Sequence, residues 1–523
     1  MKFSSVESLE PRIAPATILN NVVTYTDPDG DTVAVSTTKG TFVLGTNIHF
    51  MNSGGGEQLL DIIPDAAFAK GNLTVAVTTK VGDGKADVGF INAAGVDLGV
   101  VNVQGDLGRI VVGDLDTKAS VKTLQVDSLG FKGLTTQNGA GDLVSHIAGK
   151  VGKLVVTTNG IKDAHVDVIG GVVNGSIATV DITGDIQGGA NADEGRISVE
   201  GSIKKLTIHG SVKGGAGDRS GSVLALGSLG SVIIDKNLEG GTADKSGFIG
   251  TSGVLKSLIV TNVQGGTGAT ATNSGQIASG GAMSKVTIKG TVLGGDGDFS
   301  GYINCLGTLG KITITGSIQG GSGASSGGVF GQTAIKAMTM AVGTSISSGT
   351  GALSGSVNTR GTLGSLIVGD LAGFDATHPV NISAVTLIKK FVAHSTTFTN
   401  ILAGYDGSTA MNENAKIGSA TITGDVDTTN IVAGVKDAGA NGFGNGDDVK
   451  INAATDTILS TISKLIIGGT VNPTAGQYGI TAELVKAITV GPTKTKIVLQ
   501  KNAHTDTTPI VLATGINVRE VPA

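Results

Sequence analysis

The chain lacks tryptophan altogether, has only 3% aromatic residues, and contains a single cysteine, Cys305. One cysteine excludes an internal disulfide framework, and no His or second Cys lies near Cys305, so we expect a buried, inert thiol. No apolar run approaches the roughly 18 residues of a transmembrane helix. Lys and Arg are scattered singly in a chain of formal net charge −5, which argues against a nucleic-acid partner.

Glycine, in contrast, is abundant. The chain has 85 glycines in 523 residues, well above the usual share of about 7%. Glycine does not recur at every third position, so a collagen triple helix is excluded. Hydrophobic residues make up 39% of the chain, and a core can therefore be buried despite the glycine content.

Many of these glycines recur with a fixed period. An aliphatic or Met residue stands two positions after each repeat glycine, and an apolar, polar, apolar triplet starts five positions after it. Most steps are 26 residues long and one is 28. The repeat glycines are Gly149, Gly175, Gly201, Gly227, Gly253, Gly281 and Gly307. A period of about 20 to 50 residues is typical of one supersecondary unit stacked on its neighbours.

The repeat predicts short strands in a stack. In the triplet 206–208, Leu and Ile face one side and Thr the other, as in a half-buried strand. A second apolar signal follows a Ser-Gly pair in each repeat, as at 220–223 and 300–303, which predicts a three-faced coil. Propeller blades are longer, about 40 residues, and carry aromatic signatures that this chain lacks. We therefore expect an all-β parallel β-solenoid (β-helix) with about 26 residues per coil.

The pattern divides the chain into four parts. We expect an amino-terminal β cap at 19–104, the regular β-solenoid at 105–395, and irregular closing coils with a carboxy-terminal cap at 396–523. Residues 1–18 come before the cap, and their resemblance to a leader is described below. In the cap, apolar runs at 22–26 and 32–36 flank an acidic turn, which predicts a hairpin. Residues 81–87 form a second acidic turn.

The acidic turns raise the question of calcium. Asp27, Asp29 and Asp31 alternate as in the opening of a calcium loop, but no helix with a distant Glu follows, so a plain turn is the favoured interpretation. A glycine-rich turn in each coil carries another equivalent set, Asp218, Asp244 and Asp298. Its resemblance to tandem calcium-binding nonapeptides is superficial, because the motif occurs once per coil. Calcium remains an option at these six aspartates, and no other cofactor is expected.

The amino terminus carries a short motif and no apolar segment of a secretory signal. Leu9, Glu10, Pro11 and Arg12 resemble the leader motif of the LEPR-XLL family of large bacterial envelope or exported repeat proteins. Ile13 follows as expected, whereas residues 14–15 are Ala-Pro where the family name has two leucines. The resemblance covers about ten residues. It implies a location in the cell envelope or outside the cell, and it implies no activity.

Catalytic residues are not apparent. Polysaccharide lyases and glycoside hydrolases with β-helix folds need clustered carboxylates, and no coil presents two or three acids on one outward strand face. We therefore expect a non-enzymatic structural or adhesive protein of the cell envelope or extracellular space, with a carbohydrate-active β-helix enzyme as the alternative. Surface or matrix polysaccharide or protein would be its partner, and end-to-end self-association is a further option. Phe374, Tyr405 and Phe443, scarce aromatics in irregular loops, are the candidate binding residues.

Overall fold

The computed structural model describes residues 15–116, 118–452, 458–473, 476–500, 504–513 and 515–522. It is all-β, with 51% strand and 2% helix, and its parallel coils lie about 26 residues apart in sequence, in about 16 turns of β-solenoid across the described residues. The predicted fold class is confirmed. The leader residues Leu9 to Arg12 lie outside the described residues. The chain divides into unit 1 (1–187 and 194–210) and unit 2 (188–193 and 211–523), which are described separately below.

Unit 1 begins with an antiparallel cap. Its strands are β1 Thr17–Leu19, β2 Val22–Thr26, β3 Thr32–Thr37, β4 Ile48–Ser53, β5 Gly56–Ile62 and β6 Leu73–Thr79. β2 and β3 form the predicted hairpin, with Thr26 opposite Thr32. β1 pairs with β2, β3 with β6 and β4 with β5, all antiparallel. The alternating burial of β2 and β3 turns one face of the hairpin inward.

Parallel coiling in unit 1 starts before the predicted boundary at residue 105. β7 and β8 already pair in parallel, and residue 105 falls inside β8. The coil strands are β7 Val88–Ala94, β8 Leu98–Gly113, β9 Ala119–Leu129, β10 Val144–Ala148, β11 Lys150–Lys162, β12 His165–Ile169, β13 Ile177–Ile182, β14 Asp185–Gln187, β15 Arg196–Val199 and β16 Ile203–Ile208. Short helices are η1 Ala66–Phe68, η2 Gly133–Gln137 and α1 Gly171–Asn174. The cap is therefore continuous with the first coils.

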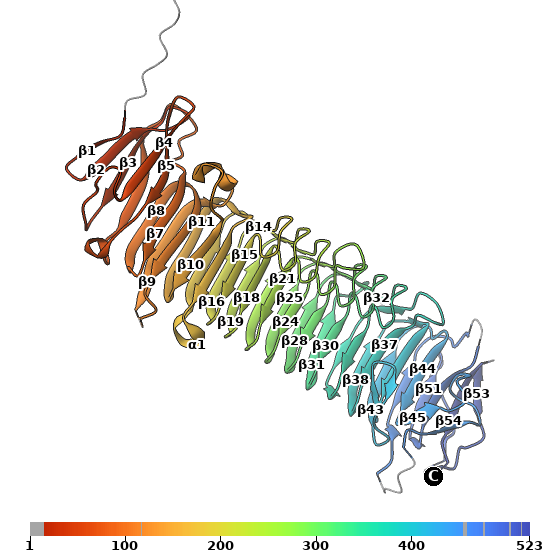
Figure 1. Cartoon of the computed structure of the whole chain (residues 1–523). Helices are drawn as coiled ribbons and strands as arrows, with labels where there is room; N and C mark the ends of the chain where they lie inside the picture. Colours follow the sequence, from red (N-terminus) through yellow and green to blue (C-terminus); the bar gives the residue numbers. More distant parts are fainter. Residues whose placement is uncertain are drawn as a thin grey trace, which may run out of the picture. The chain divides into compact units, whose positions relative to one another are not determined.

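In unit 2, each regular coil gives one strand to each of three columns (Figure 1). The first column follows the repeat glycines: β19 Leu229–Ile234, β22 Leu255–Val260, β25 Met283–Ile288, β28 Thr308–Ile314, β31 Ala334–Met340, β34 Thr362–Leu363, β35 Leu366–Ile367, β38 Leu387–Ala393, β43 Lys416–Ile422, β47 Thr461–Ile462, β48 Leu465–Ile467, β50 Leu484–Val485 and β51 Ile488–Val490. The second column is short: β17 Val212–Lys213, β20 Leu238–Glu239, β23 Val263–Gln264, β26 Val292–Leu293, β29 Ile318–Gln319, β32 Ser345–Ser347, β36 Asp370–Ala372 and β39 Thr396–Thr397.

The third column follows the Ser-Gly pairs. It contains β18 Ser222–Ala225, β21 Phe248–Thr251, β24 Ile277–Ser279, β27 Ile303–Cys305, β30 Val329–Gly331, β33 Val357–Thr359, β37 Val380–Ala384, β40 Thr399–Ala403, β44 Thr429–Ala433, β49 Tyr478–Ala482 and β54 Ile516–Glu520. Because this column continues past residue 395, the segment expected to hold irregular closing coils keeps parallel stacking. Two hairpins interrupt it, β41 Tyr405–Asp406 with β42 Thr409–Ala410, and β45 Val435–Asp437 with β46 Asp448–Lys450. β52 Thr495–Lys496 and β53 Ile510–Ala513 add antiparallel strands near the carboxyl end.

The core of unit 2 consists of apolar ladders. One position of the first column holds a buried aliphatic or Met side chain in coil after coil, in exact strand register: Leu229, Leu255, Met283, Leu309, Ile335, Leu363, Ile388, Ile417, Ile462 and Val485. Burying one such side chain contributes about 1.5–3 kcal/mol. Cys305, in β27, is free and fully buried, and burial raises the pKa of its thiol, as expected for an inert residue.

A buried serine fixes the corner before the third column. In the coil of β27, Ser300 Oγ accepts from the N–H of Gly295 at 2.9 Å and donates to the carbonyl of Gly297 at 2.6 Å. Gly301 follows with φ +58°, and its N–H donates to Ser274 O of the preceding coil at 2.8 Å. The equivalent serines are all fully buried: Ser220, Ser246, Ser274, Ser326 and Ser354. The Ser-Gly pair is therefore a corner, and the strand starts after it.

The residue before each corner serine is also left-handed, although it is not glycine. These residues form the display column, with φ between +51° and +65°. The backbone N–H of Phe299 donates to Ala324 O of the next coil at 2.9 Å. The same kind of bond is made by Asp193, Arg219, Lys245, Asn273 and Ser325. The display column consists of Arg219, Lys245, Asn273, Phe299, Ser325 and Leu353, together with Asp193, which precedes Glu194 at the equivalent corner. None of these side chains is buried.

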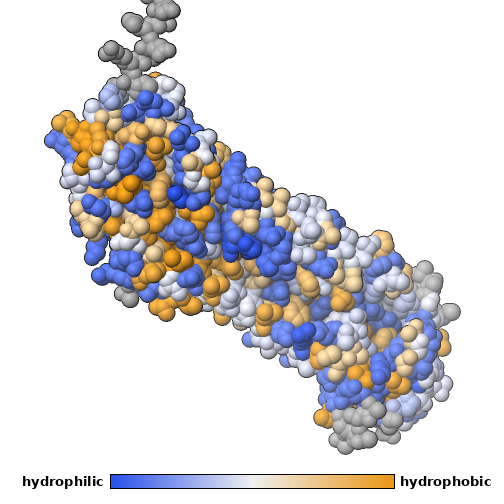
Figure 2. Space-filling model, in the orientation of Figure 1, coloured by the Kyte–Doolittle hydropathy of each residue, from blue (hydrophilic) through white to orange (hydrophobic). Residues whose placement is uncertain are grey.

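Two surface features complete the description. No helix among the described residues has the length and apolar character needed to cross a membrane. On the face seen in Figure 2, apolar residues are interspersed with hydrophilic ones in both units.

Candidate functional site

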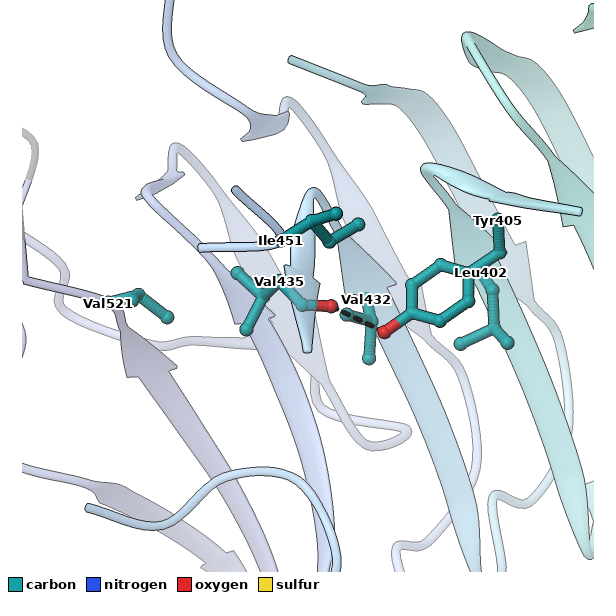
Figure 3. Packing of buried hydrophobic residues seen from close by; sticks show 6 residues of the cluster. All are labelled: Leu402, Tyr405, Val432, Val435, Ile451 and Val521. Atoms are coloured by element: carbon teal, nitrogen blue, oxygen red, sulfur yellow. Dashed lines mark hydrogen bonds between the residues drawn. The ribbon is translucent and has the colours of Figure 1, made fainter. Parts of the chain in front are cut away.

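The three candidate binding aromatics do not share a site. Tyr405 is 4% exposed, and its hydroxyl donates to the carbonyl of Val435 at 2.6 Å inside a buried cluster (Figure 3). Phe443 is partly buried and packs against the same cluster. Phe374 is 60% exposed on the turn after β36. Tyr405 and Phe443 thus pack in the core of the closing coils. Phe374 is the exposed one of the three, with its ring 6.1 Å from that of His378.

The per-coil aspartates form bonds between coils. Asp244 accepts hydrogen bonds from the side chains of Lys245, Thr272 and Asn273 at 2.7–2.9 Å, and these bonds lower the pKa of its carboxyl. Asp298 accepts from the N–H of Ala324 at 2.8 Å. Among the described residues, the groups of three or more acids with oxygens within 4.8 Å of one another do not include Asp218, Asp244 or Asp298. Their arrangement fits turn chemistry.

The alternating aspartates at the β2–β3 turn do converge. Asp27, Asp29 and Asp31 each offer an oxygen within 4.8 Å of the others. Asp31 is fully buried and accepts from the N–H groups of Val81, Gly82 and Gly84. It therefore ties the second acidic turn to the first.

A lateral groove of unit 2 was not predicted. It has a volume of about 410 Å³ and crosses the coils of β27, β30 and β33. Its floor is a row of side chains in strand register, Asn304, Phe330 and Asn358. Because parallel strands lie about 4.8 Å apart, three coils give a floor of about 10 Å.

The two walls of the groove are also rows along the stack. One wall is part of the display column, Phe299, Ser325 and Leu353, and the other is Leu306, Gln332 and Arg360. Phe299 is 42% exposed and lies edge-on to the buried Tyr302, with ring centroids 5.6 Å apart. The groove thus combines ring faces with amide groups.

A charged pair borders the groove. Arg360 Nε donates to Asp406 Oδ2 at 2.7 Å, and its guanidinium lies 5.9 Å from the centre of the Phe330 ring. Asp406 comes from the β41–β42 hairpin, so this insertion contributes to the groove. Asp406 is the only acid among the lining residues. A site with one paired carboxylate can bind a polar ligand but lacks the two carboxyl groups of glycoside hydrolysis.

The sequence held a weak signal for this groove. The 13 Phe and 4 Tyr are sparse, yet Phe299, Tyr302 and Phe330 fall within two successive coils. Aligning the coils places Phe330 between Asn304 and Asn358. The contribution of Asp406 carried no such signal, because the hairpin lies outside the repeat.

Comparisons with known proteins return no match, whether against family models, curated proteins or solved structures.

Proposed function

We propose that the chain is a non-enzymatic structural or adhesive β-solenoid of the cell envelope or extracellular space, which binds polysaccharide in the lateral groove of unit 2. The supporting observation is the floor row of Asn304, Phe330 and Asn358. The Phe330 ring beside the amide of Asn304 offers a stacking face and hydrogen-bond groups. Asn358 is 6% exposed, and its Oδ1 accepts from Ser383 Oγ. The single, paired carboxylate of the groove favours binding over hydrolysis.

Replacing the floor ring tests the binding site. We expect Phe330→Ala to weaken binding to the preferred polysaccharide at least tenfold, because the stacking face is lost. A panel of bacterial surface and matrix polysaccharides, measured by affinity electrophoresis and calorimetry, first identifies that ligand. Phe374→Ala is the matched control, since it removes an exposed ring outside the groove. Equal losses in the two variants, or loss only in Phe374→Ala, would contradict the assignment.

Location is tested on the native protein. The likeness of Leu9 to Arg12 to an envelope-protein leader supports export. Fractionation of cells and medium should recover the chain at the surface or in the medium, with an amino terminus trimmed near residues 14–16. A cytosolic protein that retains Met1 would point instead to an intracellular scaffold.

Self-association belongs to the same proposal. β1 pairs with β2 alone among the described strands, and its three residues are exposed. An exposed strand edge of this kind can pair with a second chain. End-to-end association through the cap would extend the binding surface.

A further inference from the structure

A second cavity, of about 230 Å³, lies in unit 1 beside the β2–β3 turn. Residues of the turn, of the β4–β5 hairpin, of the loop after β6 and of η2 line it. Five of the lining residues are acids: Asp27, Asp29, Glu57, Asp83 and Asp87. The two lining cations are Lys85 and Lys132, and Lys132 Nζ lies 3.5 Å from Asp87 Oδ2. Negative charge is therefore in excess around this cavity.

Three buried polar atoms of the lining have no hydrogen-bond partner. They are the Tyr25 hydroxyl, the Thr136 hydroxyl and Glu57 Oε2. Tyr25 and Thr136 are each 3% exposed and Glu57 is 9% exposed. Buried polar atoms in native proteins are nearly always paired, so three in one cavity indicate a bound polar or charged species. The hydroxyls of Tyr25 and Thr136 belong to neither acidic turn. They are therefore evidence for a bound species that is independent of the acid cluster.

The acidic residues of the β2–β3 turn differ in their hydrogen-bond partners. Asp27 Oδ1 accepts from the N–H groups of Asp29, Gly30 and Asp31. Asp29 Oδ2 accepts from the N–H of Asp83 at 2.8 Å. Asp27 and Asp29 also offer carboxylate oxygens that lie within 4.8 Å of each other. Two carboxylates this close to each other favour a cation between them.

The lining also selects the class of cation. It offers carboxylate, hydroxyl and amide oxygens and contains neither His nor Cys. Oxygen-only surroundings suit hard cations and not zinc or copper. Calcium accepts six to eight oxygens in irregular geometry, whereas magnesium demands near-octahedral geometry. A roomy cavity with donors from four separate segments fits calcium better.

We propose that this cavity binds a calcium ion through the carboxylates of Asp27 and Asp29, with the buried side chains of Glu57, Tyr25 and Thr136 bonded to the water of the ion. The ligand set differs from the alternating aspartates of the turn, because Asp31 is occupied by the 81–84 backbone. The ion would join the β2–β3 turn, the β4–β5 hairpin and η2. Calcium would then stabilise the amino-terminal cap.

Terbium luminescence provides a direct test. The chain has no Trp and four Tyr, so tyrosine alone can sensitise a bound lanthanide, and Tyr25 lines the cavity. The full chain, stripped with EDTA and desalted, should give saturable Tb³⁺ luminescence that Ca²⁺ displaces. Tyr25→Phe should remove most of this signal. Glu57→Gln combined with Asp29→Asn should weaken calorimetric Ca²⁺ binding at least tenfold and abolish the calcium-dependent rise in Tm.

The control is a charge-matched double variant in another acid group of unit 1, Asp114→Asn with Asp116→Asn. It should keep the luminescence that depends on Tyr25. If Glu57→Gln with Asp29→Asn does not fold by circular dichroism, Glu57→Gln alone and Thr136→Val replace it, each with weaker Ca²⁺ binding expected. Wild-type chain without saturable binding at 10 mM Ca²⁺, or unchanged affinity in the cavity variants, would overturn the proposal. Polysaccharide binding in unit 2 is measured separately and can succeed or fail independently.

Discussion

Gly301→Ala is expected to destabilise the coil of β27 by about 3 kcal/mol. A methyl group at Gly301 would overlap the carbonyl oxygen of Leu293, and φ is +58°, which costs an L-residue about 1 kcal/mol before any clash. The clash is with backbone, so no side chain can rotate away. Because each coil contacts only its neighbours, the loss should be local. Hydrogen exchange measured by mass spectrometry should show faster exchange in the coils around 290–330.

Gly343→Ala separates the clash from the backbone strain. Gly343 has φ +78° and no atom within 4 Å of the position of an added Cβ. This variant should therefore lose only about 1 kcal/mol, from the left-handed backbone. Equal hydrogen-exchange rates in the Gly301→Ala and Gly343→Ala variants would show that close packing at the corner does not contribute to the stability of the coils.

Ser300→Ala is expected to cost about 2 kcal/mol. The substitution leaves the Gly295 N–H without its acceptor and removes the bond from Oγ to Gly297 O in a fully buried corner. An unpaired buried donor carries a desolvation penalty of about 1–3 kcal/mol. Thermal and urea unfolding of the full chain, followed by circular dichroism, measures the change.

Ser322→Ala is the matched substitution at the surface. Ser322 is exposed, in the turn of the next coil, and its hydroxyl donates to Asp296 Oδ1 at 2.7 Å. Water can replace this bond, so the change should stay within about 0.5 kcal/mol. If Ser300→Ala proved as mild as Ser322→Ala, the buried serine ladder would not contribute to stability.

The sequence predicted the solenoid because each sequence repeat corresponds to one coil of the fold. A 26-residue period and the triplet pattern place Leu255, Met283 and Leu309 on one ladder, and the structure has them in that register. The boundary at 105 could not be located in the same way. Cap and coil strands share the alternating pattern, and the change from antiparallel to parallel pairing leaves no mark on side-chain polarity.

The candidate sites were harder to predict because they join residues across coils and insertions. Tyr405 was predicted to bind a ligand because aromatic residues are rare in the chain. Its hydroxyl instead donates to the buried carbonyl of Val435 in the closing coils. The calcium hypothesis at 27–31 concerned the same turn that lines the cavity of unit 1. However, Glu57 from β5 and Thr136 from η2 are brought to that turn only by the folding of the cap onto the first coils. Periodicity predicts only the contacts that recur from coil to coil. The contacts of Tyr405, Glu57 and Thr136 each occur once, so the repeat could not predict them.

In the display column, the chemistry of the exposed side chain is independent of the bonds that hold the backbone. Its backbone is held by N–H bonds to the next coil, whatever side chain the position carries, as Arg219, Asn273 and Phe299 illustrate. Substitutions along this line can change charge, polarity or aromatic character at a small cost in folding free energy. A lineage of such chains could therefore acquire new ligands by single replacements, without insertions and without altering the coil.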